Sequence, residues 1–396
     1  MKKILLMAAM AAMMTVSCTN DNNETTTRHN DEIKFASPVM YNVSRNVGEI
    51  TGVKYPDSET FMVYGIKYDA SKPYPGWGEE GTEQEFAAEG TEMKARYDDN
   101  KQVEGWFPAF AHYYKEGMNY AFGAFSPANY NTGVTYKDKE GLQLTNYQPA
   151  AMGQQLDLMY APRVYDKNAT TDKTDGKYSG VNIAFKHALA SVHFRVGVDP
   201  KYKRSMDKSG YKLVDGDFKI KSITLTDVKS KGNFNENIQN ETAATNKNIY
   251  SAQPTWTVDG TTTNYTFLDN TEYIDIKVPT DAQTTVKQAV VDITTIPTGK
   301  YGILIPQDIE NSGIKAVIEW QHRKWTDNDT FTIDDMKTEV LLEDHMKENK
   351  IWKQGIRYIY NVVFRGNLIY FAPTVEDWVE EEHTILPMPE NNVIVP

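Results

Sequence analysis

The chain has 396 residues, with 42 basic and 54 acidic side chains and a formal net charge of −12 at pH 7. This acidic balance, without any basic stripe, argues against nucleic acid as a partner. The single cysteine leaves no internal disulfide to form. An aromatic content of 12% with 24 tyrosines favours a β-rich fold, because aromatic side chains fit the pleated surface of a sheet.

The N-terminus has the pattern of a secretory signal. Two lysines precede an apolar run from Ile4 to Val16, which is shorter than the about 20 residues that a transmembrane helix needs. The sequence Val-Ser-Cys at residues 16–18 resembles a bacterial lipobox, in which the cysteine becomes the lipidated first residue of the mature protein. We therefore predict a signal peptide at residues 1–17 and lipidation, with palmitate among the acyl chains, at Cys18. The alternative is an ordinary signal peptide with an incidental cysteine.

Residues 19–31 read as a polar tether that is too poor in apolar side chains to fold. A first strand follows, because apolar side chains alternate along residues 33–43 and only Ser37 breaks the series. Its apolar residues are Ile33, Phe35, Val39, Tyr41 and Val43. The stretch ends next to Arg45.

Further strands are predicted, in chain order, at residues 61–68, 191–198, 217–228, 314–325 and 356–365. The third changes phase between Ile220 and Ile223, which indicates a bulge. No segment shows a long period of 3.6, so we expect an all-β protein built from β-sandwiches. Polar stretches at 166–180 and 199–210 compete as the domain boundary. The second is preferred, because residues 191–198 read as the closing strand of a sheet; the domains would then be 46–200 and 201–378, with a tail at 379–396.

Residues that could carry chemistry are few. The sequence contains no phosphate-binding, dinucleotide-binding, metalloprotease or nucleophile-elbow motif, so we expect no enzyme activity, no cofactor and no metal. His187 and His193 would lie on one strand face about 20 Å apart, too far to share a metal. The acidic residues 380–382 before His383 are read as a solvated edge. The aromatic-rich residues 105–130 are read as core, with a glycan-binding platform at Trp77, Trp106 or Tyr114 as the alternative.

Several phrases in a fixed order resemble the fimbrillin family of Bacteroides-type bacteria, the subunits of type V pili. These are the lipoprotein start, FKHALASVHFRV at 185–196, IKSITLTDVKSKGNF at 220–234, IPQ at 305–307, WKQGIRYIYNVVF at 352–364 and VEDW at 375–378. The resemblance implies two tandem transthyretin-like β-sandwiches with Greek-key type sheets. It also implies export to the outer membrane as a lipoprotein and removal of the first strand by an arginine-specific protease. The groove left behind would take a strand from another subunit.

The resemblance assigns roles to residues of this chain. Cleavage would fall between Arg45 and Asn46, since a cut at the competing Arg28 would remove only tether; the alternative is that Arg45 is a surface residue in a first strand that is not cut. The removed strand would fill the groove with Ile33, Phe35, Val39, Tyr41 and Val43. The donor would be the C-terminal tail, through the apolar residues Ile385, Leu386, Met388, Val393, Ile394 and Val395.

The tail favours a fimbrial shaft subunit that polymerises with itself or with other fimbrial subunits and serves adhesion to a host glycan or protein receptor. A tip subunit, an anchor subunit and a surface glycan-binding lipoprotein are the alternatives.

Overall fold

The computed structural model describes residues 32–40, 55–130, 133–137, 140–171, 173–174, 177–204, 213–237, 254–280, 282–326, 330–346, 350–377 and 393–394. Most of these residues lie in strands, and the helices among them are short. The helical turns are α1 (Pro200–Arg204), α2 (Val286–Ala289), η3 (Ile293–Thr295) and η4 (Leu342–Asp344). The prediction of an all-β fold is confirmed.

An eight-stranded sheet is built from the first half of the chain. Its strands follow the order β1-β12-β9-β6-β2-β4-β5, and β3 pairs with β2 beside this path. The bounds are β1 (Val39–Met40), β2 (Phe61–Asp69), β3 (Thr82–Gln84), β4 (Thr91–Tyr97), β5 (Val103–Pro108), β6 (Met118–Ser126), β9 (Met159–Lys167) and β12 (Ala184–His187). A small hairpin of β10 (Lys173–Thr174) and β11 (Lys177–Tyr178) lies outside it.

Two further sheets stack as a β-sandwich. One has the order β18-β13-β24-β25-β26, with β19 also on β13, and the other has the order β17-β14-β21-β22. The first comprises β13 (Ala190–Val198), β18 (Val290–Asp292), β19 (Gly302–Leu304), β24 (Ile356–Arg365), β25 (Leu368–Asp377) and β26 (Val393–Ile394). The second comprises β14 (Phe218–Lys229), β17 (Thr262–Asp275), β21 (Lys315–Trp325) and β22 (Phe331–Leu341).

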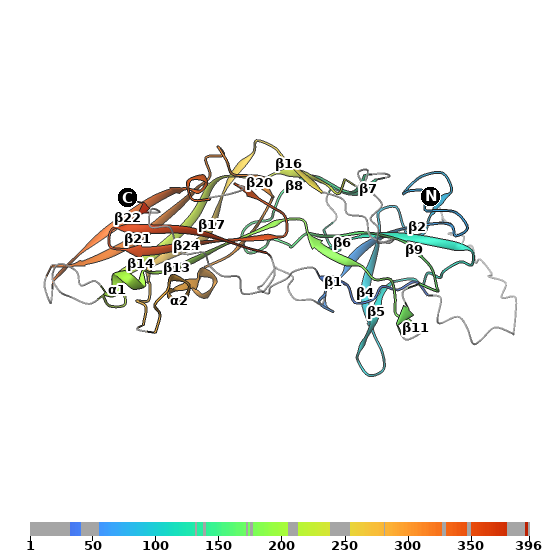
Figure 1. Ribbon diagram of the computed structural model, residues 1–396, viewed down its shortest axis with the longest axis horizontal. Coiled ribbons are helices and arrows are strands. Elements are labelled where there is room, and N and C mark those ends of the chain that lie inside the picture. Colours follow the sequence, from blue (N-terminus) through green and yellow to red (C-terminus); the bar gives the residue numbers. More distant parts are fainter. Residues whose placement is uncertain are drawn as a thin grey trace, which may run out of the picture.

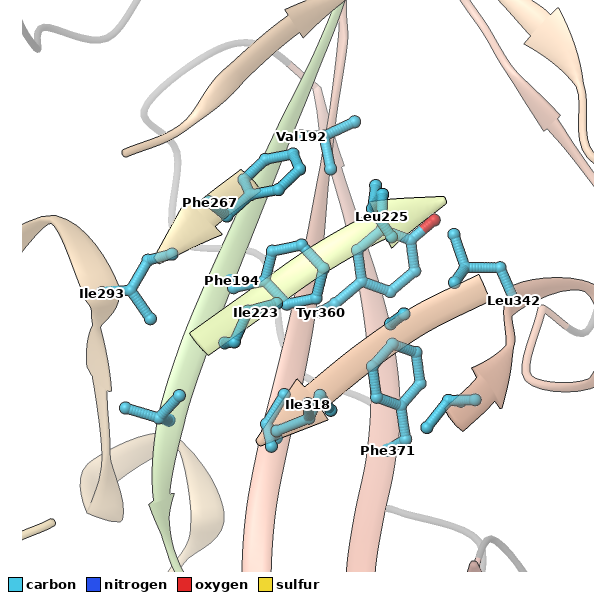
Figure 2. Packing of buried hydrophobic residues seen from close by; sticks show 14 of the residues in the cluster. Val192, Phe194, Ile223, Leu225, Phe267, Ile293, Ile318, Leu342, Tyr360 and Phe371 are labelled. Atoms are coloured by element: carbon cyan, nitrogen blue, oxygen red, sulfur yellow. The ribbon is translucent and has the colours of Figure 1, made fainter. Parts of the chain in front are cut away.

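The core of this sandwich draws side chains from both sheets. Phe194 and Tyr360 point from the first sheet toward Phe267, Ile223 and other side chains of the second (Figure 2). The rings of Phe194 and Phe267 have centroids 4.9 Å apart and meet edge to face, a geometry that aromatic pairs prefer. Burial of these side chains is the main force that holds the two sheets together.

A four-stranded sheet joins the two parts of the elongated molecule (Figure 1). Its order is β16-β15-β8-β7, so strands from the first half of the chain pair with strands from the second. The bounds are β7 (Val134–Lys137), β8 (Gly141–Tyr147), β15 (Gly232–Asn235) and β16 (Thr255–Val258). Nearby, β20 (Gln307–Asp308) pairs with β23 (Ile351–Trp352). The two parts are therefore connected by backbone hydrogen bonds as well as by chain crossings.

The strands predicted from alternation are present as β2, β13, β14, β21 and β24. The predicted bulge is confirmed, because the pairing of β14 shifts register between Ile220 and Ser222 against both of its neighbours. One expectation is wrong: residues 191–198 do not close the first sheet. They form β13 at the centre of the six-stranded sheet, parallel to β24. The chain therefore passes from the eight-stranded sheet to the six-stranded sheet between β12 and β13.

Candidate functional site

Residues 32–38 lie between β5 of the eight-stranded sheet and Val181, which precedes β12. Phe35 exchanges backbone hydrogen bonds of 2.9 Å with Trp106 of β5, which lies at one end of the strand order. On its other side, the segment accepts a hydrogen bond at Lys34 O from Val181 and donates one from the Ala36 N–H to the Val181 carbonyl. The chain then continues into β1, which lies at the other end of the order and pairs with β12. The segment therefore closes the sheet on itself.

The apolar side chains of the segment lie in the core of this sheet. Ile33 and Phe35 are fully buried. The Phe35 ring meets the rings of Phe61 and Phe122 edge to face, with centroids 6.0 and 5.3 Å away. Full burial of one such side chain stabilises the fold by about 1.5–3 kcal/mol. Removing the segment would uncover an aromatic-lined groove between β5 and residues 181–185.

Two glycines lie very close to the backbone of residues 32–38, on opposite sides of it. A Cβ on Gly180, where φ is +105°, would lie 2.6 Å from Ala36 N and 2.9 Å from the Phe35 carbonyl carbon. A Cβ on Gly105, where φ is +151°, would lie 2.9 Å from the Phe35 oxygen. Neither position has room for a side chain while the segment is in place. The groove is thus shaped to hold an extended backbone at close range.

A charged contact holds the start of the segment. The Arg96 guanidinium donates hydrogen bonds to both oxygens of Glu32, at 3.3 and 3.0 Å, and lies 3.3 Å from the centre of the Phe107 ring. Arg96 is bound a second time by Glu104. This side chain is partly exposed, so the contact contributes orientation more than stability.

The predicted site residues divide into those that the structure describes and those that it does not. Ile33 and Phe35 are buried and Val39 lies in β1, while the removal of this strand stays a prediction. The others lie outside the described residues: Cys18, Tyr41, Val43, Arg45, Asn46, Ile385, Leu386, Met388 and Val395.

Sequence reasoning missed the buried Pro38, the ring of Tyr55 that packs on Trp106 and Phe185, and both glycines. An isolated glycine beside an apolar strand is the one signal that could have indicated a close backbone approach.

Part of the predicted donor tail lies on the chain's own sandwich. Val393 and Ile394 form β26, which pairs antiparallel with Tyr370 and Ile369 of β25. The tail sequence is therefore able to form a backbone ladder with a strand edge, which is the property that a donor needs.

The alternative glycan platform is not supported at the residues suggested for it. Trp77 is 6% exposed, Trp106 is fully buried and Tyr114 is 9% exposed. Their ring faces cannot stack on a sugar, so this expectation is wrong for these three residues. Within the aromatic-rich residues 105–130, the side chains of Phe110 and Tyr113 are exposed, at 83% and 52%.

The two histidines have separate structural roles. His187 Nδ1 lies 2.9 Å from Asp157 Oδ1, and both side chains are buried. His193 Nε2 is 2.8 Å from Ser191 Oγ, while its Nδ1 is 3.8 Å from Asp292. This serine–histidine–aspartate cluster resembles a hydrolase triad in composition, but Ser191 has no exposed surface. A substrate carbonyl cannot reach its Oγ, so we assign the cluster to the structure of β13.

Neither a metal site nor a membrane span is found in the described part of the chain. No group of three or more histidine, cysteine, aspartate or glutamate side chains gathers there in a way that could hold a metal ion. Among the same residues, no helix combines the length and apolar character that crossing a membrane requires.

The family model for fimbrillin-like proteins matches residues 76–378. The chain belongs to the fimbrillin-like family. The matched region of this fimbrillin-like protein includes β5 and β12, which flank the groove, and β25, which pairs with the tail.

The solved structures that are similar to this fimbrillin-like protein include two that are described as fimbrial. A fimbrial protein from Bacteroides vulgatus is 11% identical, with a TM-score of 0.45, 88% of this chain covered and 100% of that chain. A fimbrial assembly protein from Parabacteroides distasonis is 9% identical, with a TM-score of 0.33, 87% of this chain covered and 100% of that chain. None of the curated proteins compared matches this sequence.

Proposed function

We propose that this fimbrillin-like protein is a structural subunit of cell-surface fimbriae, and that it polymerises by strand exchange at the groove described above. In this proposal it is exported as an outer-membrane lipoprotein through Cys18, cut after Arg45 and built into the shaft. The observation that carries the proposal is the position of residues 32–38 between β5 and Val181, where they complete a sheet that is otherwise open.

The location of Arg45 supports the proposed cleavage. Arg45 is the single arginine between Met40, where β1 ends, and Tyr55, where the described chain resumes. A segment tied to the body of the protein by a short linker refills its groove at a high effective concentration, on the order of millimolar. A cut after Arg45 breaks this tie, so that the segment can leave with the tether.

An emptied groove would favour entry of a new strand. It would present the aromatic wall around Phe61 and Phe122 and the backbone groups of Trp106 and Val181 that the segment now pairs. Unpaired strand edges next to apolar pockets bind an added strand. In our proposal, the C-terminal tail of a neighbouring subunit supplies it.

The test is cleavage of the purified chain from Thr19 onward with an arginine-specific protease. We expect fibres in electron micrographs and a new N-terminus at Asn46 by mass spectrometry. Arg45→Ala should stay monomeric under the same treatment, whereas the control Arg28→Ala should polymerise like the parent. Fibres from Arg45→Ala would refute cleavage at this position as the trigger.

A further inference from the structure

The groove imposes a pattern on any strand that enters it, and this pattern selects one register for the tail. The inference rests on the proposed function, because it takes the tail of a second copy of this chain as the occupant. Three features define the pattern. They are the backbone N–H groups that donate to carbonyls of the groove, one pocket for a large side chain, which holds the Phe35 ring and is called the Phe35 seat below, and one charged partner, Arg96.

The backbone donors come first. The N–H groups of Ile33, Phe35 and Ala36 donate to the carbonyls of His112, Trp106 and Val181, at 2.8, 2.9 and 3.0 Å. A proline at any of these three positions would leave a groove carbonyl without its donor. Position 38, in contrast, is a proline in the occupant that the structure shows, and it is buried there.

The Phe35 seat determines which position of an entering strand must carry a large side chain. Phe35 is fully buried, and the approach of Gly180 and Gly105 to the same peptide units holds the backbone at a set distance on both sides. A strand that slips by one residue turns its large side chain out of the seat. The register of an entering strand is therefore set at this position.

The prolines of the tail exclude half of the registers that place one of its six named apolar residues in the seat, for a strand that runs in the direction of residues 32–40. If Leu386, Met388 or Val395 took the seat, the next residue would be a proline where the Ala36 donor is needed. Of the six apolar residues named for the donor strand, Ile385, Val393 and Ile394 keep all three donors.

Two further positions distinguish these three registers. With Val393 in the seat, Glu390 falls where Glu32 binds Arg96, and Pro396 falls where Pro38 lies. The Ile385 register reproduces the glutamate but not the proline, and the Ile394 register reproduces neither. Val393 and Ile394 already form a strand on β25.

We infer that Val393 of a second copy takes the Phe35 seat, with Glu390 on Arg96 and Pro396 in the place of Pro38. Valine is smaller than phenylalanine, and Asn391 then replaces Ile33. The tail therefore fills the groove less completely than the chain's own first strand, which explains why exchange would need the cut that frees that strand.

Competition between peptides tests this register. The full chain from Thr19 is cut after Arg45 and held at nanomolar concentration. A fluorescent peptide of residues 31–45, the first strand, is bound in its groove. Peptides of residues 381–396 are then added to displace it. Val393→Phe should displace the label at about tenfold lower concentration than the parent tail, because the larger ring fills the seat. The matched controls Ile394→Phe and Ile385→Phe should bring no gain.

The charged contact gives a second readout. Glu390→Gln in the peptide should weaken displacement from the parent protein, but not from the protein with Arg96→Gln, since the two charges then no longer meet. An equal loss on both proteins would contradict the pairing.

The outcomes separate this inference from the function on which it rests. A gain from phenylalanine at Ile385 or Ile394 would overturn the Val393 register and leave the tail as donor. Displacement by unlabelled residues 31–45, but by none of the tail peptides, would overturn the tail as donor and this register with it.

Discussion

At Gly180 the backbone has a φ of +105°, and a Cβ would lie 2.6 Å from Ala36 N. Gly180→Ala should therefore loosen the first strand, because the new methyl group adds both backbone strain and overlap, on the order of 1–3 kcal/mol. Hydrogen exchange at the amides of Ile33, Phe35 and Ala36 measures the effect, and we expect faster exchange than in the parent protein.

Gly260→Ala provides the matched control for this substitution. A Cβ on Gly260 would meet nothing within 4 Å, so exchange at the same three amides should remain at the parent rate. Unchanged exchange in Gly180→Ala would show that the segment does not depend on the close approach at this residue.

Asp292 shows how a partly buried carboxylate ties stability to pH. Burial raises its pKa, but the neighbouring His193 and the hydrogen bonds from Thr294 outweigh burial and lower the pKa to about 2. A carboxyl group with a lower pKa in the folded state stabilises the fold above its unfolded pKa, near 4. This contribution is lost as the pH falls from about 4 toward 2.

Asp292→Asn should therefore lower the free energy of unfolding at pH 7 by on the order of 2 kcal/mol and by little near pH 2. Urea unfolding of both proteins across this range measures the difference. Two curves that run parallel from pH 7 to pH 2 would mean that the Asp292 charge does not support the fold.

At the scale of single elements, alternation predicts burial well only while a strand keeps one pair of neighbours. Ile33 and Phe35 are buried as their spacing predicts. After the exposed Ser37 the phase changes and Pro38 turns inward, because the segment leaves β5 and continues into β1 beside β12. The burial of Ile33 and Phe35 could thus be predicted from sequence, but the glycines and aromatic rings that surround them come from distant segments.

The position of β13 illustrates a second limit of sequence reasoning. Its residues alternate as in a half-buried strand, yet Ser191 and His193 on the other face are buried as well. Its main partner, β24, begins at Ile356, so nothing near β13 in the sequence reveals the sheet to which it belongs. Pairing over such distances is decided by the packing of the whole fold.

At the scale of the whole molecule, residues 32–38 contact the eight-stranded sheet and β26 lies in the six-stranded sheet. In the fibre that we propose, a pull would therefore pass through the junction between the two parts. Both polar and apolar contacts connect the two parts at this junction. Glu236 accepts a hydrogen bond from Leu142 N at 2.8 Å and donates its own N–H to the Leu142 carbonyl. The Phe234 ring lies 5.4 Å from that of Tyr160. A shared sheet over a shared apolar cluster should make the two parts unfold together.

Trp256 is the residue at which this coupling can be tested. Its indole N–H donates to the Ala188 carbonyl at 2.6 Å, in the turn between β12 and β13, and its ring packs on Tyr147 and Phe234. Trp256→Ala should remove a side chain that contacts both parts of the molecule, and should lower the free energy of unfolding by on the order of 2–4 kcal/mol.

The parent protein should unfold in one calorimetric transition, and Trp256→Ala should split it into two, because the parts lose the contact that couples them while each keeps its own core. Trp325→Ala is the control, since Trp325 lies at the end of β21 and bonds to Asp217, away from the junction. It should shift the single transition without splitting it. One unsplit transition in Trp256→Ala would mean that the Trp256 side chain is not needed for coupling, and that the remaining contacts, such as the backbone pairing of β8 with β15, are enough to make the two parts unfold together.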